Sequence, residues 1–198
     1  MKHYQDITLL PDAEASLGFL WHKVYQKIHL ALVENKITEN HSAVAISFPG
    51  YGTKQYPLGD KLRLFADSQA QLEKLDINQW LSRLTDYCHI KSIQSVPNVS
   101  KYVCFRRKHV KSALKKTGNL ASHLNKSFEE VLKFRKENDL YHDCQLPFIH
   151  LVSQDKDEHK KGEINRFRLF IEQSFHDSPQ QGVFNCYGLS KTATVPWF

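Results

Sequence analysis

Apolar and polar residues repeat with two different periods along the first half of the chain. Residues 3–10 alternate with the two-residue period of a half-buried strand, whereas residues 12–34 place apolar side chains three and four positions apart. The first pattern predicts a strand and the second predicts a long amphipathic helix. Further segments predict short strands at residues 43–48, 61–66 and 88–93, and helical turns at residues 67–75 and 80–87.

The predicted elements follow the order strand, helix, strand, strand, helix, strand. Two split β-α-β units have this order, and they fold into a four-stranded antiparallel sheet with two helices on one face. We therefore predict an α+β protein whose residues 1–95 form a ferredoxin-like domain (βαββαβ, RRM-like). Many unrelated proteins share this architecture, so the fold alone does not indicate a function.

The second half, residues 96–198, predicts another α+β domain. Residues 112–125 and 128–136 indicate two helices, the second with Ser127 as its N-cap. Strands are predicted at residues 102–106, 147–152, 165–173 and 182–187. The apolar residues 196–198 predict a C-terminal segment that packs against the rest of the protein.

Several protein classes are excluded. No stretch approaches the run of about 18 apolar residues that a membrane-spanning helix needs, and the charged first ten residues do not resemble a secretory signal. Four widely spaced cysteines without a C-x-x-C pair argue against a zinc ribbon or a disulfide scaffold. Reduced thiols are typical of a cytoplasmic protein, so we expect a cytoplasmic location without membrane contact.

The net charge of +6 comes entirely from the second half. Residues 1–100 hold ten basic and ten acidic side chains, so their charges balance. Residues 101–126 hold eight basic side chains and no acidic one. Because such a block concentrates positive potential on a short surface, it indicates a nucleic acid as the partner.

The sequence also limits the chemistry. No carboxylates have the spacing of a divalent-metal nuclease, and the eleven histidines form no metal-binding cluster, so we expect no metal and no other cofactor. RNA carries its own nucleophile, the 2′-hydroxyl, which a protein needs only to orient and deprotonate while it neutralises the phosphorane. His29, beside the apolar stripe of the predicted helix 12–34, is the first candidate for that proton transfer. From position alone, the alternative is a solvated surface histidine.

Short motifs recur along the chain in a specific order. The segment FNCYGLSK at residues 184–191 is followed by VPWF at residues 195–198. Other motifs precede it: HYxDI (3–7), IHxAL (28–32), ISFP (46–49), LGxxLR (58–63), LPF to SQ (146–154) and FRLFI (167–171). In this order and spacing, the motifs resemble those of the type I-F CRISPR repeat-processing endoribonucleases.

Members of that family cut the precursor CRISPR transcript at the base of each repeat stem-loop. They need no metal, leave a 2′,3′-cyclic phosphate and stay bound to the product. The resemblance implies this activity here, with the stem-loop and other subunits of a type I-F surveillance complex as partners. It implies a catalytic set in which His29 is the base, Ser153 holds the attacking hydroxyl and Tyr187 orients the histidine.

The resemblance also implies RNA-binding residues. Arg107 is expected to read a guanine edge in the lower stem through the bidentate geometry of its guanidinium. Phe167 is expected to stack on the base beside the cleavage site. The remaining RNA contacts are expected at Lys108, His109, Lys111, Lys115, Lys116, Asn119, His123, Lys126 and Gln154.

The chain departs from the family pattern in three places. His109 stands where the family has a glutamine that reads a base pair, and Asp155 stands where it often has a hydroxyl. The major-groove helix of the family is arginine-rich, whereas the corresponding segment here is rich in lysine. Since lysine lacks the planar fork of arginine, we expect weaker base reading and more dependence on the RNA backbone.

Two alternatives remain open at this point. A protein that kept the fold but lost turnover would be a structural, hairpin-binding subunit of the same complex. A ferredoxin-like domain that binds an acidic protein would also explain a basic block, but it would leave the motifs to coincidence.

Overall fold

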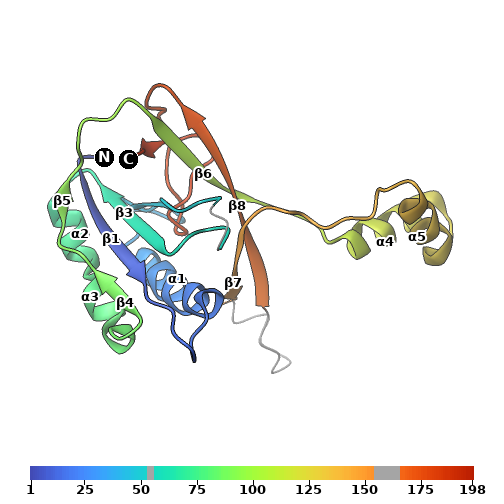
Figure 1. The fold of residues 1–198 in the computed structure, drawn as a ribbon. Coiled ribbons are helices and arrows are strands. Elements are labelled where there is room, and N and C mark those ends of the chain that lie inside the picture. The colour runs from blue at the N-terminus through green and yellow to red at the C-terminus, as the bar shows by residue number, and fades with distance from the viewer. Residues whose placement is uncertain (53–55, 154–165) are drawn as a thin grey trace. The chain divides into compact units, whose positions relative to one another are not determined.

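The computed structural model shows an α+β fold with two antiparallel sheets, which confirms the predicted class (Figure 1). It describes residues 1–52, 56–153 and 166–198. The chain divides into a larger unit, Met1–Arg107 with Pro147–Phe198, and a smaller unit, Lys108–Leu146. The domain boundary predicted between residues 95 and 96 does not coincide with this division and stays a prediction.

The first sheet comes from the first hundred residues. Its strands follow the order β2-β3-β1-β4, and β5 pairs with the end of β1 that β4 does not reach. The strands are β1 (His3–Leu9), β2 (Ala45–Ser47), β3 (Lys61–Ala66), β4 (Cys88–Ile90) and β5 (Gln94–Ser95). All the strands predicted in this half are therefore confirmed, with small differences at their ends.

Helix α1 (Leu17–Glu34) packs one face into the core of the larger unit. The prediction that it begins at residue 12 was wrong. The Asp12 carboxylate accepts a hydrogen bond from the Ala15 N–H at 2.7 Å, and this turn competes with the helix until Ser16 caps it. The buried face has the predicted three- and four-residue spacing and consists of Leu20, Trp21, Val24, Tyr25, Ile28, Ala31 and Leu32.

The second predicted helical region is split into short pieces, α2 (Gln69–Leu75), α3 (Ile77–Trp80) and the 3-10 turn η1 (Ser82–Leu84). Ser68 is the N-cap of α2. Asp76 ends α2 in the left-handed conformation, with φ of 43°. A residue in this conformation cannot continue an α-helix, so α3 starts in a new direction.

The second sheet combines segments from both ends of the second half. Its strands are β6 (Tyr102–Lys108), β7 (Phe148–Val152), β8 (Arg166–His176) and β9 (Val195–Pro196), in the order β7-β8-β6-β9. Pairing of Val195 with Val103 holds the C-terminal segment against the larger unit, as predicted.

The strand predicted at residues 182–187 was wrong. This segment has only isolated bridges, at Phe184. The side-chain oxygen of Asn185 accepts hydrogen bonds from the backbone N–H groups of Tyr187, at 2.8 Å, and Leu189, at 3.2 Å. Since an asparagine side chain that binds the backbone two residues ahead closes a turn, the chain reverses here instead of extending.

One apolar core joins the two sheets of the larger unit. Phe48, just after β2, packs edge-on against Phe105 of β6 with ring centroids 5.2 Å apart. The same ring lies 5.6 Å from that of Trp21 in α1. Because all three side chains are buried, α1 is fixed against elements of both sheets.

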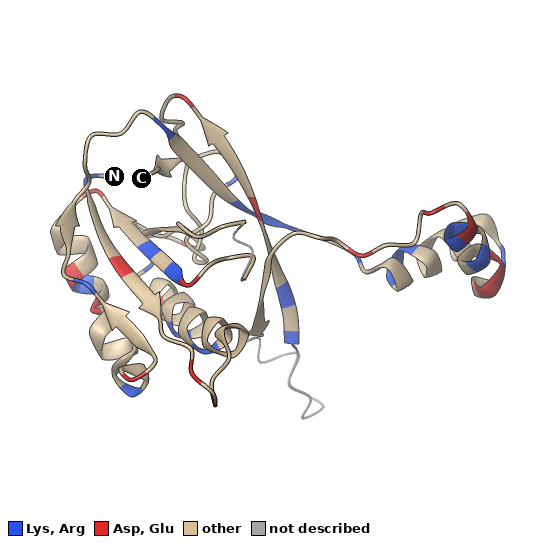
Figure 2. Ribbon diagram, in the orientation of Figure 1, with Lys and Arg blue, Asp and Glu red and all other residues tan. Residues whose placement is uncertain are grey.

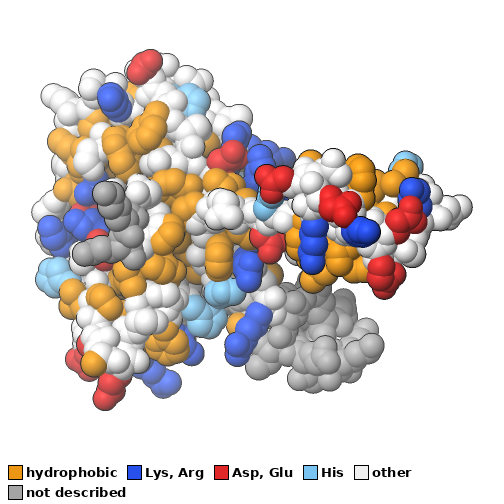
Figure 3. Space-filling model, turned by 45° about the vertical axis from the view of Figure 1, so that its right-hand side comes forward, with side chains coloured by type: hydrophobic (Ala, Val, Ile, Leu, Met, Phe, Trp, Pro, Cys, Tyr) orange, Lys and Arg blue, Asp and Glu red, His pale blue; other side chains and the backbone are white. Residues whose placement is uncertain are grey.

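The smaller unit is a helical hairpin of α4 (Ala113–Leu124) and α5 (Phe128–Glu137), capped by Ser112 and Ser127. The two helices predicted there are confirmed. The buried guanidinium of Arg135 ties them together by donating hydrogen bonds to the Thr117 hydroxyl at 3.0 Å and to the Ala113 carbonyl at 3.3 Å. On its surface, apolar side chains lie among charged ones (Figure 3), and Leu114 and Phe134 are more than half exposed.

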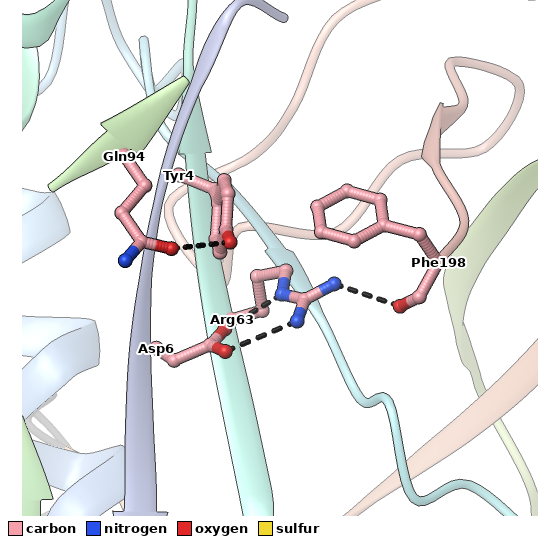
Figure 4. Close-up of polar contacts among 5 residues, drawn as sticks. All are labelled: Tyr4, Asp6, Arg63, Gln94 and Phe198. Carbon is pink, nitrogen blue, oxygen red and sulfur yellow. Dashed lines mark hydrogen bonds and ion pairs between the residues drawn. The ribbon is translucent and has the colours of Figure 1, made fainter. Parts of the chain in front are cut away.

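A buried ion pair stabilises the first sheet where the C-terminal segment meets it (Figure 4). The Arg63 guanidinium donates to both carboxylate oxygens of Asp6, at 2.6 and 3.0 Å, and to the main-chain oxygen of Phe198 at 2.8 Å. It also lies 4.0 Å from the ring of Phe198 and 4.7 Å from that of Tyr4. Because both side chains are buried, removing either charge would leave the other buried without its bidentate partner.

We expect Asp6→Asn to lower the free energy of unfolding by about 3 kcal/mol or more, because it leaves the Arg63 charge buried without its partner. The matched control is Asp67→Asn, which removes an exposed ion pair with the Met1 amino group and should cost less than about 1 kcal/mol. Urea unfolding followed by tryptophan fluorescence measures both, since all three tryptophans lie in the larger unit. Equal losses in the two variants would contradict this account of the pair.

Candidate active site

Three polar side chains form a stripe along α1. His22, Gln26 and His29 are four and three residues apart, so they lie one above another on the helix. The His22 Nδ1 donates to the carbonyl oxygen of His150 in β7 at 2.7 Å, and the Gln26 side chain accepts from the Val152 N–H at 3.1 Å. The stripe therefore follows β7 and continues to His29.

A tight turn at residues 184–190, here the 184–190 turn, lies against both sheets. The Ile46 N–H of β2 donates to the Gly188 carbonyl at 2.8 Å, and the Ser190 N–H donates to the Phe105 carbonyl of β6 at 3.0 Å. Gly188 has φ of +70°, and a Cβ at this position would lie 2.4 Å from the Ile46 Cγ1. Only glycine fits such a conformation at this distance, so the turn is held closely against β2.

His29 is bound to the 184–190 turn through one ring nitrogen. Its Nδ1 lies 2.8 Å from the carbonyl oxygen of Cys186. Because a carbonyl oxygen only accepts hydrogen bonds, Nδ1 carries the hydrogen and Nε2 keeps a lone pair in the neutral ring. The imidazole also stacks on the Tyr187 ring, with centroids 4.2 Å apart and planes 2° from parallel. These contacts fix both the tautomer and the plane of the ring.

The surroundings of His29 favour its neutral form. Burial lowers the pKa of His29, and the Arg107 charge lowers it further, while the hydrogen bond to Cys186 acts in the opposite direction. The net result is a pKa below the ordinary histidine value. A neutral imidazole with a defined lone pair on Nε2 is able to accept a proton at neutral pH.

Arg107, near the end of β6, lies over two aromatic rings. Its guanidinium is 5.1 Å from the Tyr187 ring centroid and 5.4 Å from that of Phe167 in β8. The structure thus brings together four of the predicted site residues, because Tyr187 contacts both His29 and Arg107. The cation–π contacts hold the positive charge beside the imidazole.

Ser153 directly follows β7, and Gln26 holds the end of that strand. The Gln26 amide accepts from the Val152 N–H at 3.1 Å and donates to the Val152 carbonyl at 3.4 Å. Since Gln26 precedes His29 by one helical turn, the end of β7 lies along the face of α1 that carries His29. Gln154, also predicted to contact RNA, lies outside the described residues, as does Asp155.

The predicted basic residues belong to the smaller unit, apart from Arg107. Helix α4 buries Ala113, Thr117 and Ala121, which leaves the opposite face exposed. That face and its flanks carry Lys108, His109, Lys111, Lys115, Lys116, Asn119, His123 and Lys126, all exposed. Figure 2 shows lysine and arginine on both helices of the hairpin. Lys126 forms an ion pair with Glu130 at 2.7 Å, so its charge is partly neutralised.

Within residues 1–52, 56–153 and 166–198, no three His, Cys, Asp or Glu side chains are grouped so as to hold a metal ion. The four cysteines form no disulfide, and three of them are buried. The part of the chain that the structure describes also has no helix that is long and apolar enough to cross a membrane.

The sequence matches the Cas_Csy4 family, "CRISPR-associated protein", over residues 4–198. The chain belongs to the Cas_Csy4 family. It is 31% identical over 199 residues to the CRISPR-associated endonuclease Cas6/Csy4 of Pseudomonas aeruginosa (strain UCBPP-PA14). It is 30% identical over 199 residues to the protein of the same name from Escherichia coli (strain UTI89 / UPEC), and both matches cover each chain completely. The family resemblance inferred from the motifs is confirmed.

Some residues of this Cas_Csy4 site were missed in the sequence. Gln26 holds β7, and the Tyr25 hydroxyl donates to the Tyr187 carbonyl at 2.7 Å. The polar spacing of His22, Gln26 and His29 is a signal that was present in the sequence and would have indicated Gln26. No sequence signal indicates the Cys186 carbonyl, because it acts through the backbone.

We expect Arg107→Gln to raise the pKa of His29 in the free protein, because a positive charge near the imidazole is removed. Arg106→Gln is the matched control. The Arg106 guanidinium binds Glu172 at 2.6 Å, and Arg106 is not among the groups that shift the pKa of His29. NMR titration of the His29 ring measures both variants. An unchanged pKa in Arg107→Gln would contradict the electrostatic role of Arg107.

Proposed function

We propose that the protein is a metal-independent endoribonuclease that cuts CRISPR precursor RNA at the base of the repeat stem-loop. The observation that carries the proposal is the state of His29, whose Nδ1 is bound to the Cys186 carbonyl while its ring stacks on Tyr187. This arrangement gives a neutral base with one reactive nitrogen. The endonuclease names of the Pseudomonas and Escherichia relatives support the same activity.

The reaction uses groups that RNA itself supplies. The Nε2 of His29 takes the proton of the 2′-hydroxyl, and the resulting oxygen attacks the adjacent phosphorus. A bond from phosphorus to the 2′-oxygen forms and the bond to the 5′-oxygen breaks. The departing 5′-oxygen takes up a proton from water, and His29 releases the proton it took to the solvent. The products are a 2′,3′-cyclic phosphate and a 5′-hydroxyl. No step needs an external oxidant or a metal-bound water.

Ser153 and Tyr187 complete the proposed catalytic set. The Ser153 hydroxyl holds the attacking 2′-hydroxyl in line with the phosphorus, and Gln26 supports it by fixing the backbone of Val152. Tyr187 is a positioning residue: its ring is parallel to the imidazole at 4.2 Å, and Tyr25 fixes its backbone.

RNA recognition is divided between the two units in this proposal. Arg107 reads a guanine in the lower stem, and Phe167 stacks on the base beside the cleavage site, supported by their mutual contact at 5.4 Å. Lys108, Lys111, Lys115, Lys116 and Lys126 neutralise phosphates, while His109, Asn119 and His123 add hydrogen bonds. Gln154 is part of the proposed contact set from the family resemblance alone.

The proposal extends to the fold and to the assembly. The strand order β2-β3-β1-β4, with α1 after β1 and α2 after β3, supports a ferredoxin-like first domain. We infer from the family that the protein stays on the 3′ hairpin of the mature guide, as a subunit of a type I-F effector complex in the cytoplasm.

We expect His29→Ala to abolish cleavage of a repeat hairpin in EDTA while leaving hairpin affinity nearly unchanged, because the variant loses the base but keeps the basic residues. His89→Ala is the control, since His89 is an exposed histidine of β4 outside the site. The measurement is single-turnover cleavage with detection of the cyclic-phosphate end. Normal cleavage by His29→Ala would refute the catalytic role, and a wild-type protein that binds without cutting would establish the hairpin-binding structural subunit instead.

We expect Arg107→Ala to weaken hairpin binding by about 1–3 kcal/mol and to reduce discrimination against a changed base pair in the lower stem. Arg106→Ala should have a much smaller effect, because that guanidinium is already paired with Glu172. Binding titrations with matched and mutated hairpins at fixed salt measure both. Unaltered discrimination in Arg107→Ala would refute the guanine-reading role.

A further inference from the structure

A hollow of about 550 Å³ opens on the face where α1 meets β7 and β8. The charged and aromatic side chains that line it include Lys23, Arg166, Arg168, His22, His150 and Phe167. No Asp or Glu is among the described residues that line it. Arg166 and Arg168 belong to the first residues of β8, and Figure 2 shows basic positions at the start of this strand. A concave surface with only positive charges selects an anion.

The basic groups that line the hollow lie close to one another. His150 of β7 pairs directly with Arg168 of β8 across the sheet. Burial lowers the pKa of His150, and the charges of Arg168, His22 and Arg166 lower it further. His22 donates from Nδ1 to the His150 carbonyl, and this bond fixes its ring at the wall of the hollow.

Aromatic side chains give the hollow a second property. The ring of Phe19 is half exposed at the rim, and Phe167 forms part of the wall. Cations that alternate with exposed aromatic rings are the features that bind single-stranded nucleic acid, in which phosphates meet the charges and bases stack on the rings. A free inorganic anion would not stack on the rings of Phe19 and Phe167, whereas the bases of RNA would.

The hollow shares Phe167 with the predicted site and is lined by the same helix that carries His29. His22 precedes His29 by seven residues on the same stripe of α1, about 10 Å along the helix. Phe167 lines the hollow and also lies 5.4 Å from Arg107. An RNA strand that contacts Phe167 therefore also lies beside Lys23 and Arg168, the cations of the same hollow.

We propose that this hollow binds the single-stranded RNA on the 3′ side of the scissile phosphate. The inference rests on the proposed function, in which the nucleotide on the 5′ side is continuous with the stem and is held near Arg107. Of the two RNA segments joined at the scissile phosphate, only the segment on the 3′ side leaves the stem. The hollow is a basic surface with aromatic side chains that this segment can contact. The cations of the hollow, Lys23 and Arg168, thus hold the leaving strand during the reaction and contribute nothing to the affinity for the retained hairpin.

The experiment compares affinities of the full-length protein for three RNAs made from a CRISPR repeat hairpin that the wild-type protein binds. Each RNA carries a 2′-deoxy sugar at the nucleophile, so none is cleaved. One RNA ends just after the scissile phosphate, one has a short 3′ extension, and one has an equal extension on the 5′ side of the stem. Binding is titrated at several salt concentrations.

The variant is Lys23→Gln with Arg168→Gln, which keeps side-chain length but removes two charges of the hollow. The matched control is Lys27→Gln with Arg83→Gln, two exposed cations of the larger unit that do not line the hollow. Affinity for the RNA without an extension verifies that each variant is folded. Lys23→Gln alone gives a second, milder test.

We expect the 3′ extension, and not the 5′ extension, to tighten binding by wild type. The slope of log affinity against log salt for the 3′-extended RNA should become less steep by about 1.4 in the double variant and about 0.7 in Lys23→Gln, with no change in the control. The proposal is overturned if the 3′ extension gives wild type no gain, if the gain follows the 5′ extension, or if the double variant keeps it. Cleavage of unmodified hairpin by wild type is the separate test of the proposed function, so the two failures are distinguishable.

Discussion

The hydrogen bonds of the 184–190 turn are the constraint on which the active site depends. This turn receives a bond from β2 at Gly188 and gives one to β6 from Ser190, so both sheets determine its position. From that position its backbone carbonyls at Cys186 and Tyr187 accept hydrogen bonds from His29 and Tyr25, two side chains of α1. A displacement of the turn would therefore change the tautomer, the plane and the environment of the imidazole together.

The two units are stabilised in different ways. The larger unit buries an extensive apolar core, which gives the chemistry a rigid frame. The smaller unit has few buried side chains and relies on hydrogen bonds from Arg135 to join its helices. This small core leaves most of α4 exposed, and an exposed, lysine-bearing helix is suited to contacts with an RNA backbone, which need charge more than a fixed side-chain fork.

Most of the secondary structure followed from the sequence, and the errors have local causes. The periodicity of apolar residues was sufficient to predict β3, α4 and α5, whose ends agree with the predictions to within about a residue or two. It failed at residues 12–16 and 182–187, where the Asp12 and Asn185 side chains bind nearby backbone N–H groups. In both places a polar side chain competed with regular structure, and an alternation of apolar residues does not show that competition.

The sequence by itself determined the family, the α+β class, the uneven distribution of charge and the residue types available for RNA cleavage. Those properties depend on composition, local periodicity and motif order, which are all present in the linear chain. Only the tertiary structure decided that burial lowers the pKa of His29, that its Nδ1 binds the Cys186 carbonyl, and that Arg107 lies beside Tyr187. It also decided that Lys23 and Arg168 share one hollow. The physical reason is that a pKa, a tautomer and an electrostatic potential are set by groups close in space, and His29 and Cys186 are 157 residues apart in the chain.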